Sequence, residues 1–415
     1  MKTHDLIVIG GGPAGMAAAA AAYDRGVTDV AILDREPRPG GILQQCIHNG
    51  FGLHKLGREL TGPEYAAVYE EKIRARGIPV YTETTVTGLT AGRVVTARNR
   101  DGILKIQAGA VILAMGCRER SRGALSICGS RPAGIYSAGT AQKLMNIEGY
   151  LVGKRVVILG SGDIGLIMAR RLSLEGAKVE AVCELLPYSG GLKRNIVQCL
   201  EDFGIPLYLS TTVAQIHGQD RLEGVTIAQV DEARRPIDAT RRLIPCDTLL
   251  LSVGLIPENE LSRACGVALD PVTGGPVVDE RCMTSVPGVF ACGNVLQVHD
   301  LVDYVSDEAE RAGACAAAYL QSGAPRADAF ETRAGNGVRY VLPQRIRPED
   351  EDLGLFLRVQ KPYGPVRFVV RCGEQVLLQA KRLRAAPGEM EKLTLRAAQR
   401  RLIDGPVTVE LEELP

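Results

Sequence analysis

The sequence predicts an α/β protein with two Rossmann-like folds and a small β-rich domain at its C-terminal end. Three observations lead to this prediction. A pattern of buried strand, glycine-rich turn, helix and second strand occurs twice along the chain. Short stretches near the C-terminus alternate apolar and polar residues, as half-buried strands do. The length of 415 residues is also too great for one ordinary hydrophobic core.

Composition excludes several classes of protein. Hydrophobic residues make up 46% and charged residues 23%, which is ordinary for a soluble enzyme. The net charge is +1 without a long basic block, and aromatic residues are only 4%, so no nucleic-acid partner is expected. The apolar stretch Leu6–Ala22 is interrupted by glycines, and no apolar run is long enough to span a membrane. Eleven scattered cysteines without a C-x-x-C pair predict reduced thiols in a cytoplasmic protein, and no metal site.

The two copies of the repeated unit agree in every part. The first has a strand at Leu6–Ile9, the turn Gly10-Gly11-Gly12-Pro13-Ala14-Gly15, a helix to about Tyr23, and a strand at Val30–Leu33 that ends at Asp34 and Arg35. The second has a strand at Val156–Leu159, the turn Gly160-Ser161-Gly162-Asp163-Ile164-Gly165, a helix to about Glu175, and a strand at Val179–Cys183 that ends at Glu184. The two acids lie at the same offset from their glycines.

Each part of such a unit has a known role in binding a dinucleotide. The first glycine permits a tight turn, the second lets the main chain approach a pyrophosphate, and the third lets the helix pack closely on the strand. The N–H groups and the dipole at the helix N-terminus hold the phosphate charge, and the acid receives the ribose hydroxyls. Two complete units therefore predict two dinucleotide sites. We expect the first site to use Gly10, Gly12, Pro13, Ala14, Gly15, Asp34 and Arg35. We expect the second site to use Gly160, Gly162, Asp163, Ile164, Gly165 and Glu184.

Further segments place the chain in a family. Val111–Ala114 runs into Met115 and Gly116, and Val289–Ala291 runs into Cys292, Gly293 and Asn294, before a helix expected from about Leu301 to Leu320. With these segments, residues 5–320 resemble the pyridine nucleotide-disulfide oxidoreductase superfamily. The resemblance implies FAD in the first unit and NAD(P) in the second, with an FAD domain split over residues 1–124 and 256–328, an inserted NAD(P) domain at 125–255, and the small β-rich domain at 329–415. By resemblance, the cofactors would also contact Gly41, Ala114, Gly116, Gly254, Gly293, Asn294 and Val302.

The disulfide reductases of this superfamily use a cysteine pair that this chain lacks. The position after the FAD acid offers only Cys46, so electron transfer through an internal dithiol is not expected. The stretches Gly116–Arg120 and Pro132–Gln142 resemble the FAD subunits of opine oxidase, of cyanide-forming enzymes and of dye-linked proline dehydrogenase. Gly41–Pro63 resembles an FAD oxidoreductase encoded beside glycerol-3-phosphate dehydrogenase-like proteins. These relatives imply a hetero-complex or oligomer, with a partner flavoprotein dehydrogenase and a small cysteine-rich subunit.

Three side chains are candidates for catalysis. Cys46 and His48 fall where the reactive face of the flavin is expected, and His299 adjoins the flavin helix, so each could move a proton or activate a nucleophile. A packed thiol with a hydrogen-bonded imidazole is the favoured interpretation of the first two, and a helix-capping or core role suits His299 equally well. The usual aspartate after Gly293 is Asn294, which can still hydrogen-bond the ribityl chain.

The second site leaves alternatives open. Glu184 favours NAD(H), because a carboxylate accepts a ribose hydroxyl and repels a 2′-phosphate. Arg155, Arg170, Arg171 and Lys193 could reverse that preference, and Asp163 opposes a bound pyrophosphate. We therefore expect an FAD-dependent oxidoreductase that moves electrons between NAD(H) and a partner flavoprotein or acceptor. The alternative is a non-catalytic FAD- and nucleotide-binding subunit with ATP or ADP in the second site. Residues 329–415 are expected to be dispensable for both dinucleotide folds and to dock a partner.

Overall fold

The computed structural model describes residues 2–323 and 329–414. The boundary expected at residue 328 lies outside the described residues. Contacts divide the chain into two compact units. The first unit comprises Met1–Gln44, Asn49–Cys117 and Pro257–Pro415, and the second comprises Gln45–His48 and Arg118–Ile256. Each unit contains one copy of the repeated motif.

The first unit is built on a mixed sheet with the strand order β5-β2-β1-β8-β7-β6, and β20 pairs with β8 as well. Its strands are β1 (Lys2–Ile9), β2 (Val30–Leu33), β5 (Val80–Tyr81), β6 (Thr85–Leu89), β7 (Val94–Asn99), β8 (Gly102–Leu113) and β20 (Val289–Ala291). β1 lies between β2 and β8 and runs parallel to both. Side chains on both faces of β1 are buried, which explains why Leu6–Ile9 is an unbroken apolar run.

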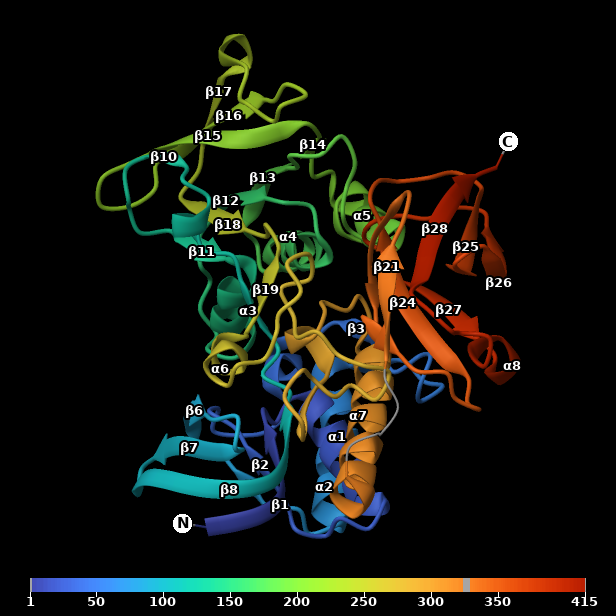
Figure 1. The fold of residues 1–415 in the computed structure, drawn as a ribbon. Helices are drawn as coiled ribbons and strands as arrows, with labels where there is room; N and C mark the ends of the chain where they lie inside the picture. The colour runs from blue at the N-terminus through green and yellow to red at the C-terminus, as the bar shows by residue number, and fades with distance from the viewer. Residues whose placement is uncertain (1, 324–328, 415) are drawn as a thin grey trace. The chain divides into compact units, whose positions relative to one another are not determined.

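Helices cover one face of this sheet. Figure 1 shows α1 (Pro13–Asp24), α2 (Gly62–Ala75) and α7 (Val302–Ser322) side by side. The contact between α1 and α7 depends on small residues, because a Cβ added at Gly313 would lie 2.1 Å from the main-chain oxygen of Ala18. The short strands β3 (Asn49–Phe51) and β4 (Leu60–Thr61) form a hairpin before α2, and α2 begins with a capping box made by Thr61 and Glu64.

The second unit has two sheets. A five-stranded parallel sheet has the order β11-β18-β12-β13-β14, and a four-stranded sheet has the order β10-β15-β16-β17. The strands are β10 (Cys128–Gly129), β11 (Ile135–Ser137), β12 (Arg155–Leu159), β13 (Lys178–Cys183), β14 (Leu207–Tyr208), β15 (Thr211–His217), β16 (Gly224–Gln229), β17 (Arg242–Pro245) and β18 (Thr248–Leu251). The helices are α3 (Ala138–Asn146), α4 (Asp163–Leu174) and α5 (Lys193–Cys199). β9 (Cys117–Glu119) and β19 (Leu255–Pro257) lie where the chain passes from one unit to the other, and α6 (Glu260–Ala264) belongs to the first unit.

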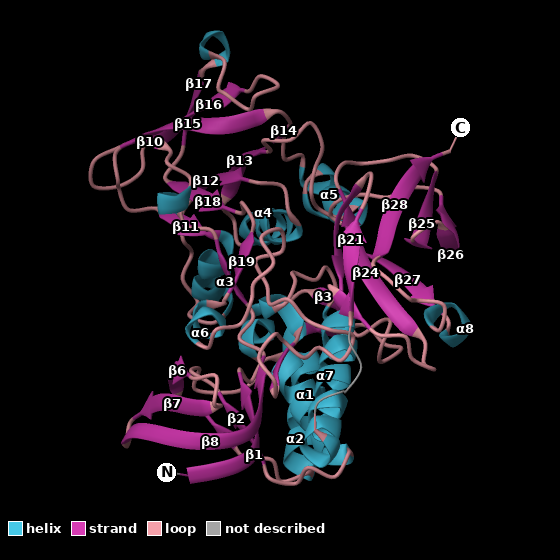
Figure 2. Cartoon of the chain, viewed as in Figure 1, coloured by secondary structure: helices cyan, strands magenta, loops and turns pink. Residues whose placement is uncertain are grey.

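The C-terminal segment is rich in strands, as expected (Figure 2). Its two sheets have the orders β23-β21-β28-β25-β26 and β22-β24-β27. The alternating sequence stretches became β24 (Leu353–Val359), β25 (Val366–Cys372), β26 (Gln375–Arg382) and β28 (Val407–Glu413). The sequence did not reveal β21 (Phe330–Ala334), β22 (Val338–Leu342), β23 (Arg345–Ile346), β27 (Glu391–Leu395) or α8 (Ala397–Arg400).

The C-terminal segment is an integral part of the first unit. Tyr340 and Leu342 of β22 are buried in the same hydrophobic cluster as Ile7 of β1 and Val111 of β8. Residues 329–415 thus supply core side chains for one face of the β1–β8 sheet, which argues against the expectation that both dinucleotide folds can form without them. Within residues 2–323 and 329–414, no helix combines the length and the apolar character needed to cross a membrane.

Candidate dinucleotide sites

The first glycine-rich turn has the geometry of a phosphate cradle. Gly10 has a φ of 108°, and a Cβ on it would lie 2.4 Å from the main-chain oxygen of Ala114. A Cβ on Gly15 would lie 1.8 Å from the main-chain oxygen of Gly10. By contrast, a Cβ on Gly12 would meet no atom within 4 Å. The outer two glycines thus serve close packing, while the main chain at Gly12 faces open space that a pyrophosphate could occupy.

The second turn repeats this arrangement. A Cβ on Gly160 would lie 2.0 Å from the oxygen of Ser252, and one on Gly165 would lie 2.7 Å from the oxygen of Gly160. At Gly162 the nearest atom would be the Ser252 hydroxyl at 3.9 Å, so this position is also open. Asp163 and Ile164 begin α4, just as Pro13 and Ala14 begin α1.

The acid that ends the second strand of each unit folds back onto its own turn. Asp34 accepts hydrogen bonds from the main-chain N–H of Gly11 at 2.5 Å and of Glu36 at 2.8 Å. Glu184 accepts from the N–H of Ser161 at 2.9 Å and from its hydroxyl at 2.7 Å. Burial raises the pKa of the Asp34 carboxyl, against the lowering effect of its two main-chain hydrogen bonds. Each carboxylate is thereby fixed at the edge of its cradle, and Arg35 is exposed beside the first.

Other residues expected at the FAD site lie against the first turn. A Cβ on Gly41 would lie 3.1 Å from the Cα of Gly12, and a Cβ on Gly293 would lie 2.8 Å from the Cβ of Ala14. The main-chain N–H of Ala114 donates to the oxygen of Ile9. Gly116 has a φ of 72° and an open Cβ position. The glycines therefore let the segments at Gly41, at Ala114 and at Gly293 approach one cradle. The main-chain N–H groups of the turn and the open space at Gly12 fit the pyrophosphate and ribose of FAD.

The turn between β20 and α7 is held by side-chain hydrogen bonds. The Asn294 side chain accepts from the N–H of His299 at 3.0 Å and donates to the Cys117 sulfur at 3.6 Å. Val302 is the first residue of α7. Next to it, the buried Asp303 accepts from the N–H groups of Gly52 and His54, at 3.1 and 2.9 Å. Asp303 therefore fixes the loop that follows β3, and both of its oxygens are already used.

His299 forms a buried pair with a residue that sequence reasoning missed. Its Nε2 lies 3.4 Å from Glu308 of α7, and both side chains are 2% exposed. Glu308 also accepts from the N–H of Gly293 at 2.7 Å and from the Gln297 amide at 3.0 Å. Burial alone would raise the pKa of Glu308, but His299, Arg311 and the Gln297 hydrogen bond outweigh it and lower that pKa. Nothing in the helical pattern of α7 distinguished this carboxylate from a surface residue.

Cys46 and His48 belong to the second unit. The preceding Gln45 donates to the Gly139 oxygen and to the Gln142 side chain, and the Cys46 sulfur lies 3.8 Å from the same Gln142 oxygen. Burial raises the pKa of the Cys46 thiol to about 12. Burial lowers the pKa of His48, and the charge of Arg194 adds to that effect. These environments favour a protonated thiol and a neutral imidazole, in line with the packed interpretation.

The residues around the second turn explain the position of Asp163. Its carboxylate accepts from the N–H of Leu192 at 2.8 Å and from the Asn195 amide at 2.7 Å, so it ties the turn to the start of α5. Arg155 pairs with Glu180, and Arg171 pairs with Glu175. Gly254, in the loop after β18, has a φ of 103° and an open Cβ position.

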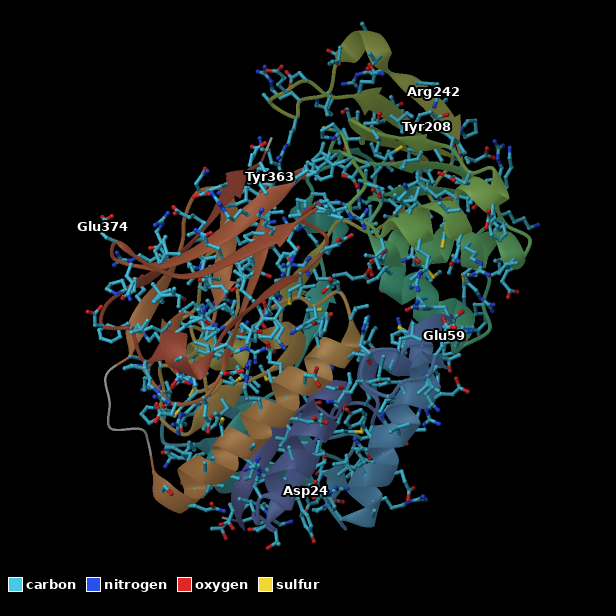
Figure 3. The ribbon with its side chains drawn as sticks, turned by 90° about the vertical axis from the view of Figure 1, so that its right-hand side faces the viewer. Asp24, Glu59, Tyr208, Arg242, Tyr363 and Glu374 are labelled. Atoms are coloured by element: carbon cyan, nitrogen blue, oxygen red, sulfur yellow. The ribbon has the colours of Figure 1, made fainter. Side chains whose placement is uncertain are left out.

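A further feature of this edge was not expected from the sequence. Tyr208 lies beside Glu184 at this edge, and its main-chain oxygen accepts a hydrogen bond from the Glu184 N–H. The Arg242 guanidinium stacks over the Tyr208 ring at 4.7 Å, and Figure 3 labels both residues at the edge of the second unit.

Two glycine cradles, each with its own fixed acid, define a protein with two dinucleotide-binding folds. The family model described as pyridine nucleotide-disulphide oxidoreductase matches residues 4–316, and the chain belongs to this family. It has the two-domain FAD and nicotinamide-nucleotide fold of that family. The superfamily assignment made from the sequence motifs is thus confirmed.

Individual relatives share most of the chain's family region. An opine oxidase subunit of Agrobacterium tumefaciens (strain Ach5) is 28% identical over an alignment of 317 residues, and the match covers 70% of this chain and 61% of that protein. Hydrogen cyanide synthase subunit HcnB of Pseudomonas aeruginosa is 27% identical over 284 residues, covering 63% of this chain and 59% of its own length. The thioredoxin reductase of T. acidophilum is similar in structure, with a TM-score of 0.64, 26% identity, and coverage of 78% of this chain and all of that one. The chain thus spans about three fifths of these two curated relatives.

Proposed function

We propose that this protein carries electrons between NAD(H) and a partner flavoprotein or acceptor through FAD, without an internal disulfide. The observation that supports the proposal most directly is the equivalence of the two turns. Gly12 and Gly162 both face open space, while the glycines on either side are confined by main chain. The open position at Gly162 and the fixed carboxylate of Glu184 are both features that a bound dinucleotide requires, and packing of the turn alone does not require them.

The charges around the second turn favour NAD(H) over NADP(H). Glu184 stands where the adenine ribose would bind, and its carboxylate would repel a 2′-phosphate. Arg155 is paired with Glu180 of the neighbouring strand β13, and Arg171 is paired with Glu175 at the C-terminal end of its own helix. Arg242 is stacked on Tyr208. Of the four cations named from the sequence, Arg170 and Lys193 are therefore left as candidates to receive a 2′-phosphate. The negative charge of Asp163 is directed to Leu192 and Asn195, which lessens its opposition to a bound pyrophosphate.

The protein's own task in such a reaction is chiefly orientation. FAD, when bound, supplies the two-electron chemistry. Gly12 and the N-terminus of α1 would hold its pyrophosphate, Asp34 its ribose, and Asn294 its ribityl chain. The absence of a neighbouring cysteine and the protonated state of Cys46 argue against a thiol relay. All eleven cysteines are free, which suits a reducing compartment such as the cytoplasm.

A partner is part of the proposal. Two relatives are by name parts of larger enzymes, an opine oxidase and a hydrogen cyanide synthase. We propose that this chain likewise works in a complex, with a flavoprotein dehydrogenase and a small cysteine-rich protein as its neighbours. Co-purification of the tagged full chain from its native source, followed by mass spectrometry, identifies them.

Anaerobic mixing with NADH tests the electron-transfer function. The purified holoprotein should rapidly lose the absorbance of its oxidised flavin, at about 450 nm, when NADH is added. Gly162→Val should keep FAD but abolish this bleaching, because the new side chain would fill the open cradle. If the wild-type flavin stays oxidised with both NADH and NADPH, while ATP or ADP binds to the second site, the chain is instead a nucleotide-binding subunit without NAD(H) chemistry.

A further inference from the structure

The His299–Glu308 pair lies directly behind the turn proposed to hold the flavin. Glu308 binds the N–H of Gly293, the residue before Asn294, and His299 donates its own N–H to the Asn294 side chain. Gly293 in turn approaches Ala14 at the first cradle. Through Glu308, the pair is therefore linked by one hydrogen bond to the main chain on which the cofactor would lie, and the main-chain N–H of His299 holds the Asn294 side chain.

One ring nitrogen of His299 lacks a partner. Nε2 faces Glu308, whereas Nδ1 is buried and has no hydrogen-bond partner among the described residues. A neutral imidazole that donates from Nε2 to the carboxylate leaves Nδ1 as an unused acceptor. This nitrogen can accept a proton, and the Glu308 carboxylate would stabilise the resulting imidazolium.

We propose that His299 is a redox-linked proton site, which gains a proton at Nδ1 when the bound flavin is reduced. The proposal rests on the FAD site of the proposed function. Two electrons from a reductant, with one proton, leave the reduced flavin with a negative charge. The second proton comes from solvent and converts neutral His299 to imidazolium, so the new charge is balanced within the protein. A negative charge on the flavin and a positive charge on the buried imidazole would stabilise each other, because water screens them little there. This attraction couples the two events.

Other ionisable groups surround this pair. α7 contributes Glu308 and Arg311, and the turn itself contributes Asp300. The C-terminal segment contributes Arg358, which donates to the Val298 oxygen and lies 3.8 Å from Asp300, and Tyr340, whose pKa is raised chiefly by burial. None of these groups is a second imidazole, so His299 is the group among them whose ordinary pKa lies near neutrality.

Proton uptake on reduction tests the proposal. The FAD-loaded protein is reduced with electrochemically generated methyl viologen radical, which releases no proton on oxidation, in weak buffer between about pH 6 and 8. The protons taken up per two electrons are counted with an indicator dye. Wild type should take up close to two protons in part of this range, and His299→Asn and His299→Gln should take up one. His4→Asn is the matched control, since His4 also pairs with a carboxylate, Asp29, at the far end of β1. It should behave as wild type.

Each outcome decides the matter. Uptake of one proton per two electrons by wild type at every pH would overturn the proposal, whatever the variants do. Retention of the second proton by both His299 variants would also overturn it. Glu308→Gln should move the two-proton range to lower pH, because the imidazolium loses its counter-charge. The reductant is not NADH, so a failed NAD(H) function leaves this result unaffected, and the absence of released FAD would refute the proposed function separately.

Discussion

Arg347 donates from Nη1 to the carboxylate of Asp279 over 2.8 Å, and neither side chain is more than 10% exposed. The same nitrogen lies 3.0 Å from Glu280, which Arg400 approaches at 3.5 Å. These pairs join the strand-rich C-terminal segment to residues that precede β20, within one compact unit. Together with Tyr340 and Leu342, they make the segment part of the first unit's core.

Removal of the C-terminal segment should therefore cost the protein its flavin. Truncation after Gln321 would expose the apolar face under Tyr340 and Leu342 and leave Asp279 and Glu280 without their arginines. We expect aggregation or loss of FAD, measured by size-exclusion chromatography and flavin content. A soluble truncated protein with full FAD occupancy would contradict this prediction. It would support the expectation that residues 329–415 form a separate domain that docks a partner.

Arg347→Met should destabilise the full chain by about 3–5 kcal/mol, because it removes the ion-pair partner of the buried Asp279 and one of the partners of Glu280. The pKa of Glu280 is already raised, first by burial and then by Asp279, and Arg347 opposes that rise. A carboxyl with a raised folded-state pKa binds its proton more tightly in the fold, so its ionisation lowers stability as pH rises through that pKa. The loss in urea denaturation should therefore be smaller at about pH 5 than at about pH 8. Arg384→Met, at an exposed pair, is the control.

Gly12→Val should give a folded protein without FAD. No atom lies within 4 Å of the added Cβ, so the apoprotein can accommodate it, but the side chain would stand in the place of the pyrophosphate. Gly15→Val should instead disrupt folding, since its Cβ would lie 1.8 Å from the Gly10 oxygen. Circular dichroism and released-flavin analysis separate the two outcomes. Full FAD occupancy in Gly12→Val would refute the assignment of this cradle.

Cys46→Ser should retain flavin reduction within about tenfold of wild type, or about 1.4 kcal/mol of barrier. With its pKa raised to about 12 by burial, the thiol is protonated at neutral pH and becomes a nucleophile only as pH approaches that value. Iodoacetamide at about pH 8 should therefore modify the exposed Cys128 well before Cys46, as mass spectrometry would show. Loss of turnover with flavin retained in Cys46→Ser would mean that the thiol is essential.

The sequence was most informative where local chemistry alone dictates structure. Gly10, Gly12 and Gly15 can be assigned different roles from spacing, because each role follows from the shape of one turn. Glu308 and Arg347 could not be found in this way. Their partners His299 and Asp279 lie 9 and 68 residues away, and only the packing of the fold brings them together. The short strands β21 to β23 were missed because runs of two to five residues carry too little periodicity to stand out.

Glu184→Gln should weaken the preference for NADH over NADPH. The carboxylate is held by Ser161 at the edge of the second cradle, where it can accept a ribose hydroxyl and repel a 2′-phosphate. Loss of its charge should lower the NADH affinity by roughly tenfold, about the strength of one charge-assisted hydrogen bond, and should improve binding of NADPH. Glu180→Gln is the matched control, because Glu180 lies on the same strand but pairs with Arg155 and Lys178. Stopped-flow bleaching over a range of NADH and NADPH concentrations gives both affinities. Faster reduction of wild type by NADPH than by NADH would mean that Glu184 does not set the preference, and that Arg170 or Lys193 receives the 2′-phosphate instead.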